Sequence, residues 1–470
     1  MSRRGLHTIG SHADFLAELA AAVLDGRLLN GWERTGPFWL ADVTIILPTK
    51  RAQLRLAEIF AQRLGGAALL PDIRTLGGES AEEEPFLPPA EHPPEPHAAS
   101  ALERRLVLAR LIGAFAHSSD AAEIFSAPPN PAEMLWLADS LGALIDDLEI
   151  EGISHRALRE LVPEELAANW QQIITFLEVV LSAWPKILKE RGKGDAALLR
   201  NARLNRQAAT LKLVYGDRPV IAAGSTGSIP ATAKLLGAIS KLKRGMVVLP
   251  GLDISLTAEQ HDALLAEGAN THGHPQYGLA RLLRRLGLGI ADVEELTPEP
   301  SPRATIVRAA LALADETPHW PAIRAKIGDA AFDAALAGVT ILAAPNADLE
   351  ARAIALAARH AVGEGQSVGI VTPDQNLGRR IAAELNRFGI ATDDPAGTPL
   401  YQSAIGRLAR LVLAAGESRL AAVDLMALLR NGAVTLGLER GELARRAELV
   451  EFKLLRGQFP AAGIAGLRDG

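Results

Sequence analysis

The chain contains no cysteine. Disulfides, thiolate nucleophiles, cysteine-ligated zinc and cysteine-held iron–sulfur clusters are therefore excluded within its 470 residues. No stretch reaches the roughly 18 uninterrupted apolar residues of a membrane span. Polar residues follow the basic start of the chain, where a signal peptide would have an apolar segment. We therefore expect a soluble, cytoplasmic protein.

Excess positive charge is also lacking. Lys and Arg number 49 against 55 Asp and Glu, which gives a formal net charge of −6. No global positive field attracts nucleic acid, so any such contact must rest on a local patch. Aromatic residues make up only 4% of the chain, but the 48% hydrophobic content is that of an ordinary globular protein.

The first turn of the chain lacks the residues that bind a nucleotide. The strand-like run Leu6–Ile9 leads through Gly10, Ser11 and Asp14 into a helical pattern, which is the layout of a phosphate-binding loop. That loop needs Gly-x-x-x-x-Gly-Lys-Ser/Thr, whose lysine reaches the β- and γ-phosphates. The second glycine and the lysine are missing, and the Asp14 carboxylate would repel a triphosphate. We interpret Gly10, Ser11 and Asp14 as a vestigial, non-hydrolysing nucleotide loop.

Apolar, β-branched runs predict buried strands of a parallel sheet, each followed by a helix. The clearest are Val43–Leu47, Pro219–Ala223 and Gly245–Pro250. Between the first two, residues from about Ala101 to Asn205 show helical periodicity and almost no strand signal. This pattern predicts an α/β fold in which a large helical insertion interrupts one sheet.

A second parallel sheet is expected further along the chain. Its predicted strands are Val339–Ala343, Gln366–Val371 and Ile390–Thr392, with helices between them. After Gly406 the sequence pattern predicts helices nearly to the end of the chain. The last residues do not resemble a domain end, so we expect the chain to stop inside a larger protein.

This order of a sheet, a helical insertion, the same sheet and a second sheet is similar to superfamily-1 helicases, a likeness of fold that gives weak support for function. In helicase terms, residues 1–80 begin domain 1A, and residues 211–335 return to it. Residues 81–210 between them form a mostly helical, 1B-like insertion, with an acidic, proline-rich linker at 79–97. Residues 336–410 form a 2A-like α/β domain, and residues 411–470 begin a helical, 2B-like insertion.

Six segments carry a more specific resemblance. They are Ile45–Ala52 (IILPTKRA), Ala222–Thr232 (AAGSTGSIPAT), Val248–Asp253 (VLPGLD), His274–Tyr277, Val371–Asp374 and Asp393–Leu400. Together they are similar to the AddB subunits, of alphaproteobacterial type, of AddAB double-strand-break repair helicase–nucleases. The second and third segments are quite specific, and the resemblance covers essentially the whole chain.

The resemblance implies a function and partners. AddB-like subunits are longer, with an often motor-dead helicase-like half and a nuclease half that in many members holds a cysteine-ligated iron–sulfur cluster. They pair with the motor subunit AddA and scan DNA for a recombination hotspot. We accordingly expect no cofactor, ATPase or nuclease activity in this chain. The iron–sulfur cluster and Mg²⁺ would belong to the nuclease half, and DNA and an AddA-type motor would be partners of the chain.

Two loops are candidates for DNA contact. Thr49, Lys50 and Arg51 follow one predicted strand, and Ser225, Thr226 and Ser228 follow another. Ligands collect at the carboxyl ends of parallel strands, and cations and hydroxyls suit phosphate. The competing interpretations are a solvated helix start with two surface cations for the first loop, and a helix N-cap at Ser228 for the second.

Other polar residues have plainer interpretations. Asp253 follows a strand, where an active motor places a magnesium carboxylate, but it has no acidic neighbour and reads as a turn residue. His272 and His274 lack further metal ligands nearby. The acidic clusters Asp146–Asp147–Glu149 and Glu164–Glu165 are interpreted as solvated helix faces, and the pairs Arg104–Arg105 and Arg284–Arg285 as surface residues without a special role.

The leading hypothesis is therefore a non-motor, helicase-like part of a DNA-repair subunit. Two rival classes remain open. One is an active ATP-dependent DNA helicase with an atypical phosphate loop, and the other is a pure protein-interaction scaffold for the motor partner.

Overall fold

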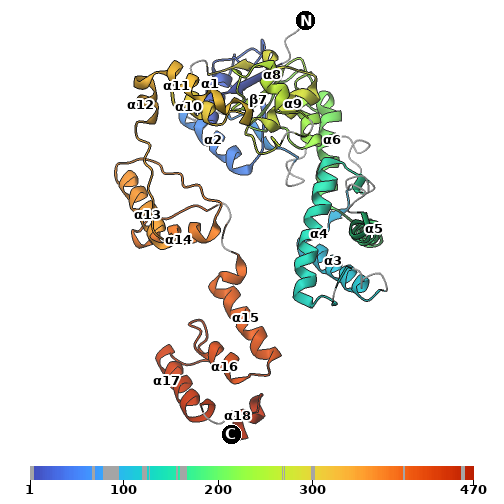
Figure 1. Ribbon diagram of the computed structural model, residues 1–470, viewed down its shortest axis with the longest axis vertical. Coiled ribbons are helices and arrows are strands. Elements are labelled where there is room, and N and C mark those ends of the chain that lie inside the picture. Colours follow the sequence, from blue (N-terminus) through green and yellow to red (C-terminus); the bar gives the residue numbers. More distant parts are fainter. Residues whose placement is uncertain are drawn as a thin grey trace. The chain divides into compact units, whose positions relative to one another are not determined.

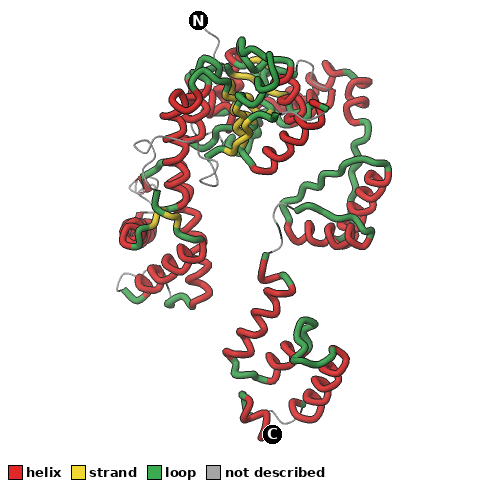
Figure 2. Tube along the Cα trace, turned by 180° about the vertical axis from the view of Figure 1, so that it is seen from behind, coloured by secondary structure: helices red, strands yellow, loops and turns green. Residues whose placement is uncertain are grey.

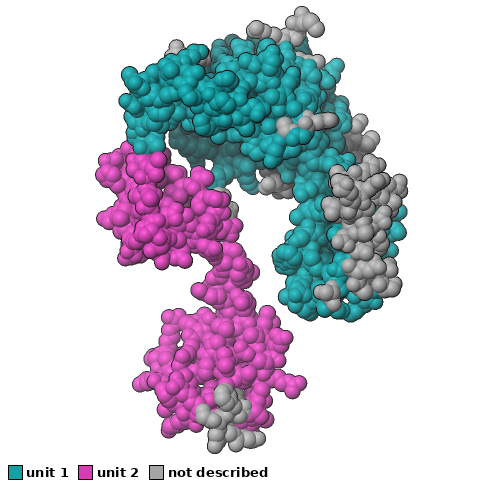
Figure 3. Space-filling view, in the orientation of Figure 1, with its two compact units in different colours: residues 1–339 teal, residues 340–470 magenta. Residues whose placement is uncertain are grey.

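The computed structural model describes residues 5–65, 69–77, 95–118, 124–125, 127–154, 157–158, 167–266, 268, 270–297, 302–394, 397, 399–456 and 461–469. The chain divides into two compact units, unit 1 (residues 1–339) and unit 2 (residues 340–470) (Figure 3). Most of the expected linker at 79–97 and the Glu164–Glu165 cluster lie outside the described residues. Among the helices described, none is both long and apolar enough to cross a membrane.

A six-stranded, fully parallel sheet forms the centre of unit 1 (Figure 1), in the order β3-β2-β6-β7-β1-β8. Its strands are β1 (Leu6–Ile9), β2 (Thr44–Leu47), β3 (Asp72–Thr75), β6 (Val220–Ala223), β7 (Gly245–Pro250) and β8 (Glu294–Glu295). Every residue of β1, β2 and β6 is buried, as expected of apolar runs covered on both faces. The expected α/β class with a parallel sheet is confirmed.

The strands on either side of the helical insertion pair directly with each other. Ile45 of β2 lies opposite Ile221 of β6 in parallel register. The prediction that a helical block interrupts one sheet, rather than separating two sheets, is therefore confirmed.

Helices cover the two faces of the sheet in separate sets. On one face lie α1 (Phe15–Leu24) and α2 (Lys50–Leu64), whose side chains share a core with Ile45. On the other lie α6 (Ala196–Tyr215), α7 (Pro230–Ile239) and α9 (Tyr277–Leu286), which share a core with Ile46. Side chains of successive strand residues thus pack into the cores on opposite faces of the sheet, as the two-residue period of a strand requires.

The strand order creates two switch points. Connections from β1 and β2 run toward the β3 edge, and those from β6 and β7 run toward the β8 edge. The direction therefore reverses between β7 and β1, and again between β2 and β6. Open α/β sheets bind ligands at such points, beyond the carboxyl ends of the strands.

The insertion has a core of its own. Helices α3 (Ala101–Ala116), α4 (Pro131–Glu151) and α5 (Ala167–Glu190) bury a common apolar cluster, and β4 (His97–Ala98) pairs with β5 (Lys193–Gly194). The side chain of Arg104 is only 16% exposed and donates to Asp146 Oδ1 at 2.8 Å. The interpretation of Arg104 as a surface residue is therefore wrong. The helical periodicity of a sequence indicates which face of a helix a residue occupies. It does not reveal whether a distant acidic partner allows an arginine there to be buried.

Four shorter α-helices also belong to the described part of unit 1. They are α8 (Ala258–Ala263), α10 (Pro302–Ala310), α11 (Trp320–Ile327) and α12 (Asp329–Leu336).

The regular secondary structure in the described residues of unit 2 is helical, and Figure 2 shows it as red helices joined by green loops. The α-helices among these residues are α13 (Ala347–Gly363), α14 (Gln375–Arg387), α15 (Ala404–Glu417), α16 (Ala422–Leu429), α17 (Arg440–Val450) and α18 (Ile464–Asp469). A small apolar cluster joins α13 to α14.

The second parallel sheet does not form in the described residues. Val339–Ala343, Gln366–Val371 and Ile390–Thr392 have no strand partner there, and Ile341 and Val371 are 93% and 98% exposed. Strand preference depends on packing and on a neighbouring strand. Since no described segment of unit 2 supplies that neighbour, the β-branched runs remain irregular.

Burial of His7 on β1 links the stability of the sheet to pH. The residue is 8% exposed, and its Nδ1 has no hydrogen-bond partner. Burial lowers the pKa of His7 below 6.5, although Glu294 acts in the opposite direction. Below pH 6.5, His7 is therefore protonated more readily in the unfolded chain than in the folded protein. The free energy of unfolding consequently decreases as the pH falls.

We expect His7→Leu to reduce this loss of stability between pH 7 and pH 5, by at most about 1.4 kcal/mol per pH unit. Urea unfolding at a series of pH values measures the effect. Some dependence will remain, because burial also lowers the pKa of His261. The control His360→Gln changes an exposed side chain and should keep the wild-type profile. An unchanged profile in His7→Leu would contradict the prediction.

Candidate nucleic-acid interface at the carboxyl edge of the sheet

The turn after β1 is closed by its own hydrogen bonds. The Gly10 N–H donates to the buried Thr297 Oγ1 at 2.8 Å, and the Ala13 N–H donates to the Gly10 carbonyl at 3.1 Å. Asp14 is the N-cap of α1 and accepts the Ala17 N–H at 3.1 Å. A phosphate bound at a helix start needs such N–H groups, and here protein atoms already engage three of them.

The same turn also packs against its surroundings. A Cβ added to Gly251, just after β7, would lie 3.4 Å from the Cβ of Ser11. A Cβ added to Gly10 would lie 2.4 Å from Cε1 of His12, so that ring lies directly over the glycine. The β7–β1 switch point is therefore filled by the side chains and backbone of its own two turns.

Asp253 is neutralised by an arginine. Its side chain is 10% exposed, and its Oδ2 lies 2.7 Å from Nε of Arg308 on α10. Its Oδ1 accepts from the Ser255 N–H at 3.0 Å and from the Ser255 hydroxyl at 2.7 Å. The interpretation of Asp253 as a turn residue is confirmed, and the sequence had not predicted the guanidinium beside it.

The histidines near this turn have packing roles. His272 packs against Tyr277, with ring centroids 4.8 Å apart and ring planes tilted by 50°. His274 Nδ1 accepts from the Gln276 N–H at 3.1 Å, and its Nε2 lies 2.7 Å from the Leu311 carbonyl oxygen. Within the described ranges, no three His, Asp or Glu residues are grouped to hold a metal ion.

At the β2–β6 switch point, polar groups are accessible instead. Thr49 caps α2 by accepting the Ala52 N–H at 3.2 Å. Thr49, Lys50 and Arg51 are all exposed. In the part of the chain that the structure describes, no residue forms a hydrogen bond or ion pair with the Lys50 ammonium. This cation is available to a ligand at the edge of the sheet.

The loop after β6 lies beside the end of β2. A Cβ added to Gly224 would lie 3.5 Å from Cδ of Pro48, the residue that follows β2. Gly224 and Gly227 have φ of +79° and +59°, a conformation that favours glycine. Ser225 Oγ accepts the Gly227 N–H at 3.2 Å, while Thr226 and Ser228 are exposed. The structure thus brings the two predicted DNA-contact loops together.

The predicted N-cap at Ser228 is wrong. Ile229 holds that position and makes no side-chain cap bond, because Pro230 occupies the first helical position. Proline is preferred at the first position, so the cap moves to the residue just before it. Among the described residues, none is hydrogen-bonded to the Ser228 hydroxyl.

Helix α9 runs alongside this loop, which the sequence did not reveal. A Cβ on Gly278 would lie 3.8 Å from Thr226, and a Cβ on Gly227 would lie 2.6 Å from Leu282. Arg285 Nη1 then donates to the Ser228 carbonyl at 3.1 Å. The interpretation of Arg285 as a surface residue without a role therefore needs correction, because helical periodicity does not indicate which distant loop an arginine meets.

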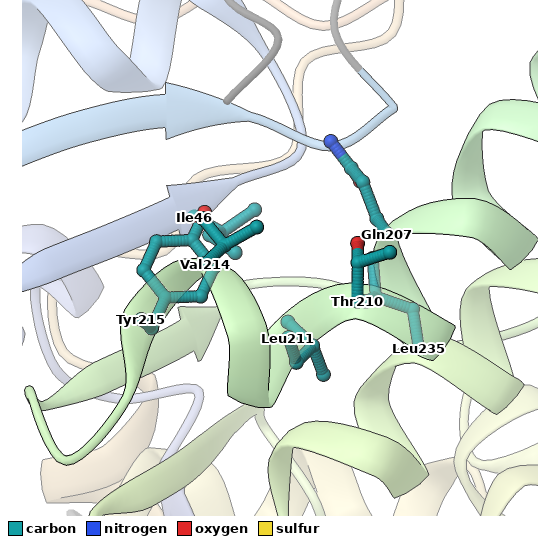
Figure 4. A pocket seen from close by; sticks show the side chains of 7 residues that line it. All are labelled: Ile46, Gln207, Thr210, Leu211, Val214, Tyr215 and Leu235. Atoms are coloured by element: carbon teal, nitrogen blue, oxygen red, sulfur yellow. The ribbon is translucent and has the colours of Figure 1, made fainter. Parts of the chain in front are cut away.

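A small cavity between β2 and α6 is not a ligand site. Figure 4 shows the side chains that line it: Ile46, Gln207, Thr210, Leu211, Val214, Tyr215 and Leu235. Its volume of about 10 Å³ has room for about one water molecule. Burial there raises the pKa of Tyr215.

The hydrogen bond that closes the β1 turn can be tested by mutation. Thr297→Val keeps the side-chain shape but leaves the buried Gly10 N–H without an acceptor, which should cost about 1–3 kcal/mol of stability. Thr297→Ser retains the acceptor and should lose less, and urea unfolding compares the two. An equal loss in both variants would mean that the threonine methyl group, rather than the hydrogen bond, stabilises the turn.

Comparison with known proteins adds no family assignment. No family model matches the chain, and no curated protein matches it significantly. The candidate interface is therefore defined by its geometry: a closed turn at the β7–β1 switch point and accessible hydroxyls and cations at the β2–β6 switch point.

Proposed function

We propose that the chain is a non-motor, helicase-like scaffold that contacts DNA phosphates as part of an AddB-type subunit in double-strand-break repair. A cytoplasmic location and an AddA-type motor partner belong to the same proposal. The observation that carries it is the pairing of β2 with β6, which sets Thr49 and Lys50 beside the Ser225–Ser228 loop.

The chemistry of this edge fits the sugar–phosphate backbone better than the bases. Hydroxyl, ammonium and guanidinium groups bind phosphate oxygens and carry no sequence information. Base stacking needs aromatic side chains, and aromatics are only 4% of the chain. With a net charge of −6, binding by the isolated chain should be weak and sensitive to salt.

Of the rival functions, an active ATPase has less support. Its loop needs free N–H donors and a lysine, whereas the Gly10 N–H is bound to Thr297 and no lysine follows in the turn. The scaffold alternative has one observation in its favour. Large apolar side chains of unit 2, including Ile405 and Leu413 on α15, are 76% and 72% exposed, and such surfaces commonly meet a protein partner.

We expect the double variant Lys50→Ala/Arg51→Ala to weaken binding to a fluorescent oligothymidine. The slope of log affinity against log salt should fall by about 0.7 for each phosphate that the variant no longer neutralises. Fluorescence anisotropy at several salt concentrations measures both effects. Sequence preference should not change, because phosphate contacts do not read bases.

A charge-matched control is the double variant Arg63→Ala/Lys241→Ala. Both residues are exposed, Arg63 in the last turn of α2 and Lys241 just before β7, at the opposite edge of the sheet. This variant should bind like wild type. Equal weakening in the two double variants would point to net charge alone, and an unchanged slope in the first would place the DNA path elsewhere.

The chain should neither bind Mg-ATP tightly nor hydrolyse it, because the β1 turn lacks the motif lysine and its donors are engaged. Isothermal titration calorimetry and a phosphate-release assay measure the two properties. Saturable binding in the micromolar range, or turnover above a protein-free blank, would favour the helicase alternative.

A further inference from the structure

Two arginines of α9 converge on one carboxylate of the helical insertion. Arg281 contacts Glu151, the last residue of α4, through Nη2 at 2.7 Å and Nη1 at 3.4 Å. Arg285 Nη2 lies 3.5 Å from the same Oε2 of Glu151. Two positive charges thus share one negative charge, which leaves the cluster with a net charge of +1.

Arg285 is held in position but only weakly neutralised. Charge-assisted N–H···O bonds are typically about 2.7–2.9 Å long, well below its 3.5 Å distance to Glu151. Its other terminal nitrogen is fixed by the Ser228 carbonyl at 3.1 Å. The side chains of Arg281, Arg285 and Glu151 are 34%, 28% and 29% exposed, so a ligand can reach all three.

The geometry of this cluster suits a phosphodiester. A guanidinium fork binds carboxylate and phosphate oxygens in the same bidentate way, and arginine is favoured over lysine where that geometry matters. The two free oxygens of a phosphodiester match the two carboxylate oxygens of Glu151. The glutamate therefore occupies the place that a phosphate group would take between the arginines.

The cluster also borders the candidate interface. Because α9 lies alongside the loop from Thr226 to Ser228, Arg285 donates a hydrogen bond to that loop at the Ser228 carbonyl. We propose that Arg281 and Arg285 form an additional phosphate-binding site for the nucleic-acid backbone, and that Glu151 is an internal competitor which a backbone phosphate displaces. This inference rests on the proposed DNA contact and extends it from the sheet edge to α9.

Neutralising Glu151 distinguishes this site from a purely structural ion pair. A structural bridge between α4 and α9 would make Glu151→Gln less stable without improving DNA binding. A competitor would make the same variant bind oligothymidine more tightly, by about fivefold for one removed charge near a phosphate. Asp147→Asn removes a carboxylate from the same helix, where Asp147 is exposed, and should change binding less than about twofold if the effect is local.

Arg284 provides a matched control for Arg285. It is adjacent in sequence and donates instead to the Leu265 carbonyl at 3.2 Å. Arg285→Ala should weaken oligothymidine binding about tenfold, the worth of one charged hydrogen-bond contact, and should lower the salt slope by about 0.7. Arg284→Ala should match wild type. Thermal unfolding of every variant separates a loss of binding from a loss of folding.

The outcomes are separable from those of the proposed function. If Lys50→Ala/Arg51→Ala weakens binding but Arg285→Ala behaves like Arg284→Ala, the α9 site is overturned and the sheet-edge contact stands. Unchanged or weaker binding in Glu151→Gln also overturns it. If inorganic phosphate stabilises wild type against heat through Arg285 while oligothymidine binding does not depend on that residue, the ligand is free phosphate and the nucleic-acid assignment fails.

Discussion

The direct pairing of β2 with β6 is the constraint on which the rest of unit 1 depends. It returns the chain to the centre of the sheet after the long helical insertion. Such a detour is tolerated because the entropy of closing a loop rises only slowly with its length. The same pairing sets two strand ends, and the polar loops that follow them, side by side. A single register thereby determines both the core and the candidate interface.

The carboxyl edge of the sheet has two different halves. On the β1 side, polar groups satisfy one another: Thr8 Oγ1 donates to the Leu249 carbonyl and accepts from the Leu252 N–H, each at 3.1 Å, and Arg308 neutralises Asp253. On the β2–β6 side, hydroxyls and the Lys50 ammonium face solvent. Buried polar groups must be paired, so the β1 side stabilises the fold whereas the other side has capacity for a ligand.

Much of the sheet could be predicted from the sequence because buried parallel strands are continuous apolar runs, such as Thr44–Leu47, that leave little ambiguity. Because Thr49 and Ser225 directly follow two of these runs, their location at the carboxyl edge of the sheet could also be predicted. The partners of Asp253 and Arg285 could not be predicted, because no local pattern specifies which distant loop or helix an ionised side chain meets. The strand predicted from the β-branched run around Ile341 is wrong for a related reason: a strand preference takes effect only where a neighbouring strand is present.

The helical insertion has a further consequence for protein engineering. Helices α3, α4 and α5 bury their own core, while α6 contributes Leu204 and Leu211 to the core of the sheet. A parallel crossover from β3 to β6 needs a connection of about a dozen residues or more, usually a helix, and α6 alone meets that requirement. We therefore expect the sheet to keep its topology when the three preceding helices are excised or exchanged at the α6 junction, although the change also removes the contacts of Glu149 with α6 and of Glu151 with α9.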